Sequence, residues 1–177
     1  MDETGESVEI ARQVRAMFRP DFETARLSDV SLEDLWARGF RGIIIDLDNT
    51  VCGYHESTLA PGVRDWVLAA KARGFALALV SNNFRERVAA VGAQLDVPAV
   101  PNALKPLPQG FLLALRHLRT RRAQTVVIGD QLFTDVLGAK ILGLHAVLTQ
   151  PIVPKDFPLT RVLRFMERVF FARVPRG

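Results

Sequence analysis

Five short and nearly continuous apolar runs recur along the chain, and helix-like segments separate them. The runs are GIIIDL (42–47), FALALVS (75–81), VPAV (97–100), TVVIGD (125–130) and HAVLTQ (145–150). Continuous apolar strands are typical of sheets covered on both faces, and strands that alternate with helices imply right-handed crossovers between parallel strands. The sequence therefore predicts a single three-layer, Rossmann-like α/β domain around a central parallel sheet.

Helical spacing and capping residues place the predicted helices between and before these runs. They cover residues 6–18, 31–38, 61–74, a segment that starts at 83–86, a segment from 108 to about 122, and 132–142. Ser31 with Asp34 resembles a capping box, and Asn83 with Glu86 resembles the start of another helix. We expect an N-terminal extension over 1–30, a catalytic core over 31–150 and an amphipathic helix over 159–173.

Length and composition fit one ordinary globular domain. The chain has 177 residues, of which 49% are hydrophobic and 24% charged, and no stretch reaches the roughly 18 apolar residues of a membrane span. The N-terminus MDETGESVE is acidic and does not resemble a secretory signal. Cys52 is the only cysteine, which excludes an internal disulfide and fits a reducing compartment. We therefore expect a cytoplasmic protein.

The net charge of +4 belongs to one segment. Residues 159–177 carry five arginines against one acid, Glu167, whereas the other 158 residues are formally neutral. A nucleic-acid footprint over the whole domain is therefore not indicated, and we expect no nucleic-acid partner.

Polar residues collect where the predicted strands end. In a parallel sheet these ends form one ligand-binding edge. The residues are Asp46, Asp48, Ser81, Asn82, Lys105, Asp130 and Asp135. Each has an ordinary explanation by itself: roughly 0.7 Asp-x-Asp pairs are expected by chance from the composition, Lys105 alone would be a solvated charge, and Asn83 is better explained as a helix cap than as a ligand. Their joint order at four consecutive strands favours a shared site.

The charges of these residues indicate that such a site would bind a metal ion. Asp46, Asp48, Asp130 and Asp135 would bring four negative charges against one Lys105, and like charges so close destabilise the ionised forms. A hard divalent cation with oxygen ligands removes the conflict, and Mg²⁺ suits a site that also meets a phosphate.

The segments DLDNT, VSNN, LKP and GDQLFTD resemble, in order and spacing, the four motifs of haloacid dehalogenase-type phosphohydrolases. The resemblance covers about residues 20–150. It is closer to the YqeG-type branch of the subclass IIIA phosphatases, related to phosphatidylglycerophosphate phosphatase, through the Pro-Asp pair at 20–21 and the phrase RGFRGIIIDLDNT. Val51 stands where leucine is more usual.

That resemblance implies a mechanism. Asp46 would attack phosphorus and form an aspartyl-phosphate, and Asp48 would act as general acid and then as general base. Asp46, Asp130 and the backbone carbonyl of Asp48 would bind Mg²⁺, and Asp135 would either support the metal or orient Lys105. Ser81, the Asn82 amide and Lys105 would bind the phosphoryl oxygens.

The same resemblance gives meaning to the short segments after the first and second motifs, where a cap domain could stand. Family members often carry a cap domain after the first or the second motif, but residues 51–60 and 84–104 are too few to hold one. We therefore expect an uncapped site that takes a large or surface-held phosphate ester, with phosphatidylglycerophosphate as the first substrate hypothesis and a phosphoprotein or nucleic-acid end as alternatives. A receiver-like signalling module and a non-catalytic phosphate-binding scaffold are rival readings. The intact set of acids argues against a non-catalytic scaffold. A receiver module carries its phosphoacceptor aspartate at the end of the third strand, whereas in this chain the third predicted strand ends without an acid.

The segment 159–173 has Val162, Phe165 and Phe170 on one helical face and arginines on another. A basic amphipathic helix of this kind can lie on an anionic membrane, which would make the protein peripheral to it. Docking of the apolar face on the sheet is the alternative, and the sequence favours neither.

Overall fold

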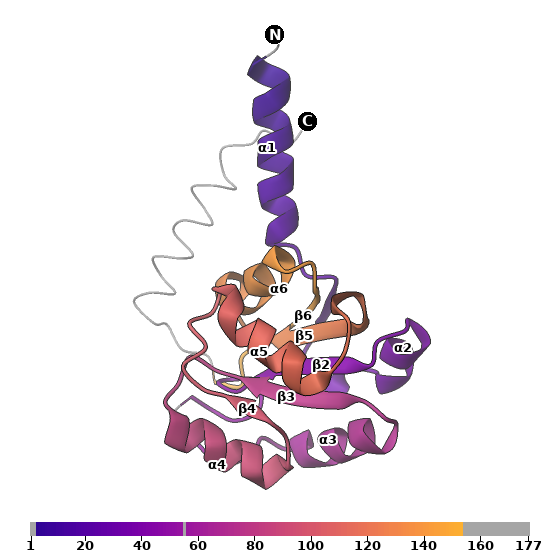
Figure 1. The fold of residues 1–177 in the computed structure, drawn as a ribbon, viewed down its shortest axis with the longest axis vertical. Helices are drawn as coiled ribbons and strands as arrows, with labels where there is room; N and C mark the ends of the chain where they lie inside the picture. Colours follow the sequence, from indigo (N-terminus) through magenta and orange to yellow (C-terminus); the bar gives the residue numbers. More distant parts are fainter. Residues whose placement is uncertain (1–2, 55, 154–177) are drawn as a thin grey trace.

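A computed structural model of the protein describes residues 3–54 and 56–153. It contains a six-stranded sheet with the order β1-β6-β5-β2-β3-β4, in which all paired strands are parallel (Figure 1). The strands are β1 (Phe22–Thr24), β2 (Gly42–Asp46), β3 (Ala76–Val80), β4 (Ala99–Val100), β5 (Thr125–Gly129) and β6 (His145–Thr149). The predicted α/β class and parallel sheet are confirmed.

Helices cover both faces of this sheet. They are α1 (Glu3–Met17), α2 (Leu32–Ala37), α3 (Val63–Ala72), α4 (Arg85–Leu95), α5 (Pro108–Leu118) and α6 (Leu137–Ile141), with short turns η1 (Leu27–Asp29), η2 (Arg122–Gln124) and the π-helical η3 (Leu132–Val136). In Figure 1, α3 and α4 lie on one side of the strands, and α5 and α6 on the other. These layers match the predicted three-layer arrangement.

The central strand β2 shows why two cores form. Successive side chains of a strand point to opposite faces, so Ile43 and Ile45 join one core with Trp66 of α3. Ile44 joins the other core with Phe111 of α5. Because both faces of β2 are buried, its apolar run is continuous rather than alternating.

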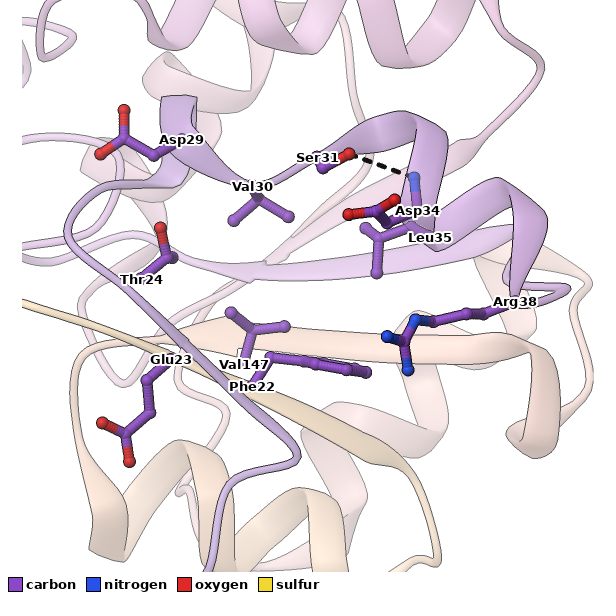
Figure 2. A pocket seen from close by; sticks show the side chains of 10 residues that line it. All are labelled: Phe22, Glu23, Thr24, Asp29, Val30, Ser31, Asp34, Leu35, Arg38 and Val147. Carbon is purple, nitrogen blue, oxygen red and sulfur yellow. Dashed lines mark hydrogen bonds between the residues drawn. The ribbon is translucent and has the colours of Figure 1, made fainter.

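The short helix α2 covers the edge of the sheet at β1. The Ser31 hydroxyl accepts a hydrogen bond from the backbone N–H of Asp34 at 3.1 Å, which confirms the predicted cap (Figure 2). The Arg38 guanidinium lies 4.6 Å from the centre of the Phe22 ring. A cavity of about 200 Å³ remains between these two elements, at the edge strand rather than at the strand ends of β2, β3 and β5.

Three local features differ from the prediction. Phe22–Thr24 pairs with β6, so the sheet extends into the segment expected to be an extension. Asn83 does not cap α4, which begins at Arg85 after Phe84, because the side chain of Asn83 is engaged elsewhere. The predicted helix 132–142 starts as a π-helical turn, in which the Val136 N–H donates to the carbonyl of Gln131.

The connections at which a cap domain would be inserted are short. Residues 47–62 join β2 to α3, and α4 alone lies between β3 and β4. In the part of the chain that the structure describes, no separate cap domain is present. The segment 159–173, predicted as an amphipathic helix, lies outside the described residues.

Helix α1 projects away from the sheet (Figure 1). Its end is tied down by Phe18, whose ring lies 4.9 Å from that of Phe133. Two residues of the predicted apolar face, Ile10 and Val14, are 55% and 40% exposed. Among the helices of the described residues, none is long and apolar enough to cross a membrane.

Candidate active site

The predicted site residues do gather at one edge of the sheet. Asp46 is the last residue of β2, Ser81 follows β3, and Asp130 follows β5. Lys105 lies in the connection between β4 and α5, and Asp135 lies in η3. Since parallel strands end on the same side, the topology alone brings residues 46, 81 and 130 together.

A buried lysine joins two of the acids. The ammonium of Lys105 donates to a carboxylate oxygen of Asp46 and, at 2.6 Å, to Oδ1 of Asp135. The three residues are only 7%, 5% and 1% exposed. Lys105 is thus an internal ion-pair partner and not a solvated surface charge. The second oxygen of Asp135 accepts from the Gln131 N–H at 3.2 Å.

The Asn82 side chain holds Lys105 in place. Its carbonyl oxygen accepts from the Lys105 N–H at 2.7 Å, and its amide nitrogen donates to the Lys105 carbonyl at 3.1 Å. The side chain predicted to lie beside the substrate therefore positions the backbone that carries the catalytic lysine candidate.

Burial and like charge perturb the acids. Burial raises the pKa of Asp46 well above its ordinary value; Lys105 opposes the rise, and the charges of Asp135 and Asp130 reinforce it. Burial, followed by the charge of Asp135, raises the pKa of Asp130 to about 7. Burial alone would lower the pKa of Lys105, but Asp135 and Asp46 outweigh it, so its pKa is raised and the side chain stays an ammonium. One ammonium among three acids leaves negative charge uncompensated.

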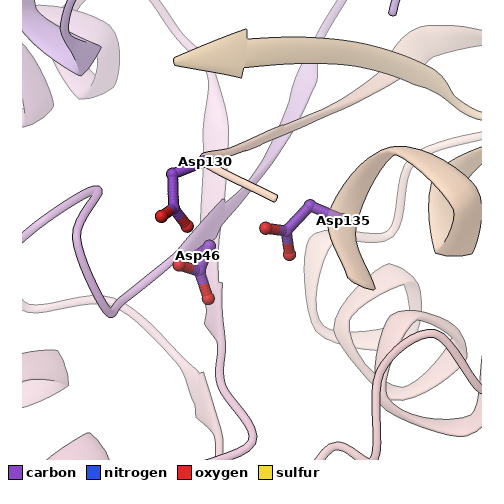
Figure 3. Close-up of side chains that lie close together, drawn as sticks. All are labelled: Asp46, Asp130 and Asp135. Atoms are coloured by element: carbon purple, nitrogen blue, oxygen red, sulfur yellow. The ribbon is translucent and has the colours of Figure 1, made fainter. Parts of the chain in front are cut away.

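The remaining charge suits a cation. Asp46, Asp130 and Asp135 turn their carboxylates toward one another (Figure 3), and one ligand atom from each lies within 4.8 Å of the others. Oδ1 of Asp130 is buried and has no hydrogen-bond partner among the described residues. Buried oxygens without partners are costly, and hard divalent cations bind such carboxylate sets. The residues present therefore fit a divalent metal.

Gly129 makes the position of Asp135 possible. A Cβ at this glycine would lie 2.3 Å from Cγ of Asp135, closer than any packed contact allows. The sequence reasoning did not single out Gly129, although its place directly before Asp130 was a usable signal.

The second acid of the Asp-x-Asp pair points to a different set of partners. Oδ2 of Asp48 accepts from the Ser81 hydroxyl at 3.1 Å, and Oδ1 accepts from Nη1 of Arg87 at 2.5 Å. The Asn83 amide nitrogen lies 3.4 Å from both oxygens. The two acids therefore have different surroundings: Asp46 faces the lysine and the other carboxylates, whereas Asp48 faces the ends of β3 and α4.

Sequence reasoning missed both Arg87 and the contact of Asn83. Asn83 was assigned to a helix cap, and the structure contradicts this. Arg87 has no motif of its own, because a charged residue on an amphipathic helix normally faces solvent.

A cavity of about 380 Å³ opens beside the loop that carries the two acids. Asn49 and Thr50 form part of its wall, and Thr50 also donates to Oδ2 of Asp46 at 3.4 Å. The hydroxyl of Thr149, on another wall, is buried and has no partner in the described residues. The cavity is linked to the site through Thr50, but none of the predicted site residues lines it.

Comparison with known proteins identifies a family and relatives for this chain. Residues 20–143 match the family model described as a haloacid dehalogenase-like hydrolase. The chain is 34% identical over 163 residues to the probable phosphatase YqeG of Bacillus subtilis, covering 92% of this chain and 95% of that protein. It is 24% identical to the chloroplastic/mitochondrial phosphatidylglycerophosphate phosphatase 1 of Arabidopsis thaliana, covering 94% of this chain but only 51% of the plant protein.

A solved structure supports the fold. The crystal structure of CbbY from Rhodobacter sphaeroides in complex with phosphate aligns with a TM-score of 0.51 at 16% identity, covering 67% of this chain and 90% of that one. The α/β fold and the family model together place the chain among the hydrolases, and it belongs to the haloacid dehalogenase-like hydrolase family. Within that family it groups with the phosphatases.

Proposed function

We propose that the protein is a Mg²⁺-dependent phosphomonoesterase that works through an aspartyl-phosphate on Asp46. The observation that carries the proposal is the buried ion-pair cluster in which Lys105 joins Asp46 to Asp135 beside the unpaired oxygen of Asp130. A receiver-like module has no use for a second acid beside the phosphoacceptor, whereas a hydrolase needs one to activate water.

In the first step, a carboxylate oxygen of Asp46 attacks phosphorus in line with the leaving alkoxide. The bond from phosphorus to the leaving oxygen breaks, and protonated Asp48 donates its proton to that oxygen. Lys105 stabilises the negative charge on the phosphoryl oxygens in the transition state, and the Ser81 hydroxyl joins it by turning from Oδ2 of Asp48 to a phosphoryl oxygen.

In the second step, water attacks the phosphorus of the aspartyl-phosphate. Asp48, now ionised, takes a proton from the water, and the bond from phosphorus to Asp46 breaks. Inorganic phosphate leaves, and both acids return to their starting forms. Asp135 serves this cycle by holding Lys105, since each of its oxygens already accepts a hydrogen bond from the protein.

Asp46, Asp130 and the backbone carbonyl of Asp48 are the residues that would hold Mg²⁺, with Asp135 in support. When bound, the ion supplies positive charge that offsets the phosphate and the clustered carboxylates.

For the substrate, we propose phosphatidylglycerophosphate presented at a membrane surface. The absence of a cap domain in the described residues and the similarity to the plant phosphatase support a substrate that extends beyond its phosphoryl group. A place at the inner face of an anionic membrane follows from this proposal.

Replacing Asp46 with Asn tests the mechanism, because an amide cannot attack phosphorus in this way. We expect hydrolysis of an aryl phosphate to be lost in Asp46→Asn while its thermal unfolding stays cooperative. A chelator should abolish the wild-type activity, and added Mg²⁺ should restore it. Turnover that persists in Asp46→Asn, or in excess chelator, would contradict the proposal.

A further inference from the structure

Arg87 contacts two separate parts of the site at once. It lies in the first turn of α4, and its side chain is only 14% exposed. Nη1 donates to Oδ1 of Asp48 at 2.5 Å. Nε donates to the carbonyl of Glu56 at 2.9 Å, and Nη2 donates to the carbonyls of Gly53 at 3.2 Å and Glu56 at 2.5 Å.

The guanidinium is suited to this arrangement. Its donors point outward from one rigid plane, so it can bind a carboxylate along one edge and carbonyls along another. The Glu56 N–H itself donates to the Gly53 carbonyl at 3.0 Å. Arg87 therefore fastens to α4 both Gly53 with Glu56 and the acid that precedes them, Asp48.

The two acids of the Asp-x-Asp pair are also paired with different cations. Lys105 compensates Asp46, and Arg87 compensates Asp48, so each acid of the Asp-x-Asp pair has a cation of its own. Arg87 holds Oδ1, and Oδ2 accepts from the Ser81 hydroxyl while Asp48 is ionised. Oδ2 is therefore the oxygen left to carry the proton when Asp48 acts as the general acid.

We propose that Arg87 is a positioning residue that aims Asp48 for proton transfer and holds the backbone of Gly53 and Glu56 beside it. This inference rests on the proposed function, because it gives Asp48 the acid–base role. Arg87 acts through Asp48 and not on the phosphoryl group.

The dependence on the leaving group tests this role. An alkyl phosphate needs a proton on its leaving oxygen, whereas an aryl phosphate with an acidic phenol needs little help. The measurement is kcat/KM, which reports the steps up to phosphoryl transfer and leaves out the hydrolysis of the intermediate. Arg87→Ala should lower kcat/KM on the order of tenfold to a hundredfold for the alkyl phosphate, and much less for the aryl phosphate.

Two matched variants accompany this comparison. Arg85→Ala removes an exposed arginine from the same helix turn and should leave both values unchanged. Arg87→Lys keeps the charge but not the planar fork, so we expect it to recover only part of the loss for the alkyl phosphate. Thermal unfolding of each variant shows whether the fold is retained.

A double-mutant cycle completes the test. If Arg87 acts only through Asp48, adding Arg87→Ala to Asp48→Asn should change kcat/KM by less than about twofold. Equal losses on both substrates, or losses that add to that of Asp48→Asn, would overturn the role of Arg87. Activity that survives Asp46→Asn would instead overturn the proposed function, so the two failures are distinguishable.

Discussion

At the scale of single residues, the site depends on one position that has no side chain. The carboxylate of Asp135 occupies the space where a Cβ at residue 129 would lie, and from there it reaches Lys105. The acid that holds the lysine is therefore placed by the glycine before the neighbouring acid. A change that adds a single methyl group should act on the whole ion-pair cluster.

We predict that Gly129→Ala displaces Asp135 and frees Lys105. Overpacking of this kind costs about 1–3 kcal/mol of stability, and hydrolysis of an aryl phosphate should fall on the order of a hundredfold. Gly42→Ala is the control, because its Cβ would also meet a side chain, Thr120, but at the start of β2 and far from the acids. Loss of stability without a larger loss of activity than in Gly42→Ala would contradict the role given to Gly129.

At the scale of elements, Asp21, which lies just before β1, contacts two of them, α6 and β6. Its Oδ2 accepts from Lys140 of α6 at 2.6 Å and from the backbone N–H of Ala146 in β6 at 2.8 Å, with Nδ1 of His145 at 3.6 Å. Burial would raise the pKa of Asp21, but these partners outweigh it and the pKa is lowered. The ionised carboxylate is thus favoured by folding.

A depressed pKa in the folded state gives stability that is present above the ordinary pKa of an aspartate, near 3.8, and lost as the pH falls through the folded value. Because Asp21 is exposed and its interactions are screened by solvent, Asp21→Asn should lower the free energy of unfolding by about 0.5–1 kcal/mol at pH 7. The difference from wild type should shrink below about pH 4, as measured by urea unfolding. Asp65→Asn, at an exposed position of α3, should show no such pH-dependent difference; a difference for Asp21→Asn that is constant with pH would contradict the argument.

The elements that sequence reasoning recovered are those with strong local signals. β2, β3 and β5 are apolar runs because both of their faces are buried, and α5 begins at Pro108 as predicted. β1 was missed because three residues, FET, at a sheet edge carry almost no apolar pattern. Its pairing with β6 depends on residues more than a hundred positions away, which no local pattern encodes.

The candidate site shows the same division. Asp46, Ser81, Lys105, Asp130 and Asp135 could be predicted because each stands at or shortly after a recognisable strand. Arg87 could not, since its contact with Asp48 spans 39 positions and links a helix to a loop. Whether Asp135 holds Lys105 or a metal was left open by the sequence; the hydrogen bond at 2.6 Å favours the lysine.

At the scale of the whole molecule, two features outside the active site bear on the proposed substrate: the exposed apolar residues of α1 and the basic composition of the segment 159–177, which lies outside the described residues. Ile10 and Val14 of the projecting helix α1 are exposed, and the segment 159–177 carries the entire net charge of the chain. A membrane surface binds exposed apolar side chains together with basic residues near anionic lipid.

We predict that phosphatidylglycerophosphate in anionic vesicles is hydrolysed in preference to a phosphopeptide and a 3′-phosphorylated oligonucleotide. Deleting residues 159–177 removes a formal charge of +4, and each basic residue near an anionic surface contributes about 1 kcal/mol to binding. The deletion should therefore lower the rate on vesicles severalfold or more and leave the rate on a soluble aryl phosphate unchanged.

Ile10→Ser with Val14→Ser tests α1 by the same comparison of two substrates. Faster turnover of the oligonucleotide or the phosphopeptide would contradict the lipid substrate, whereas equal rates on vesicles before and after the deletion would contradict only the membrane role of the basic segment.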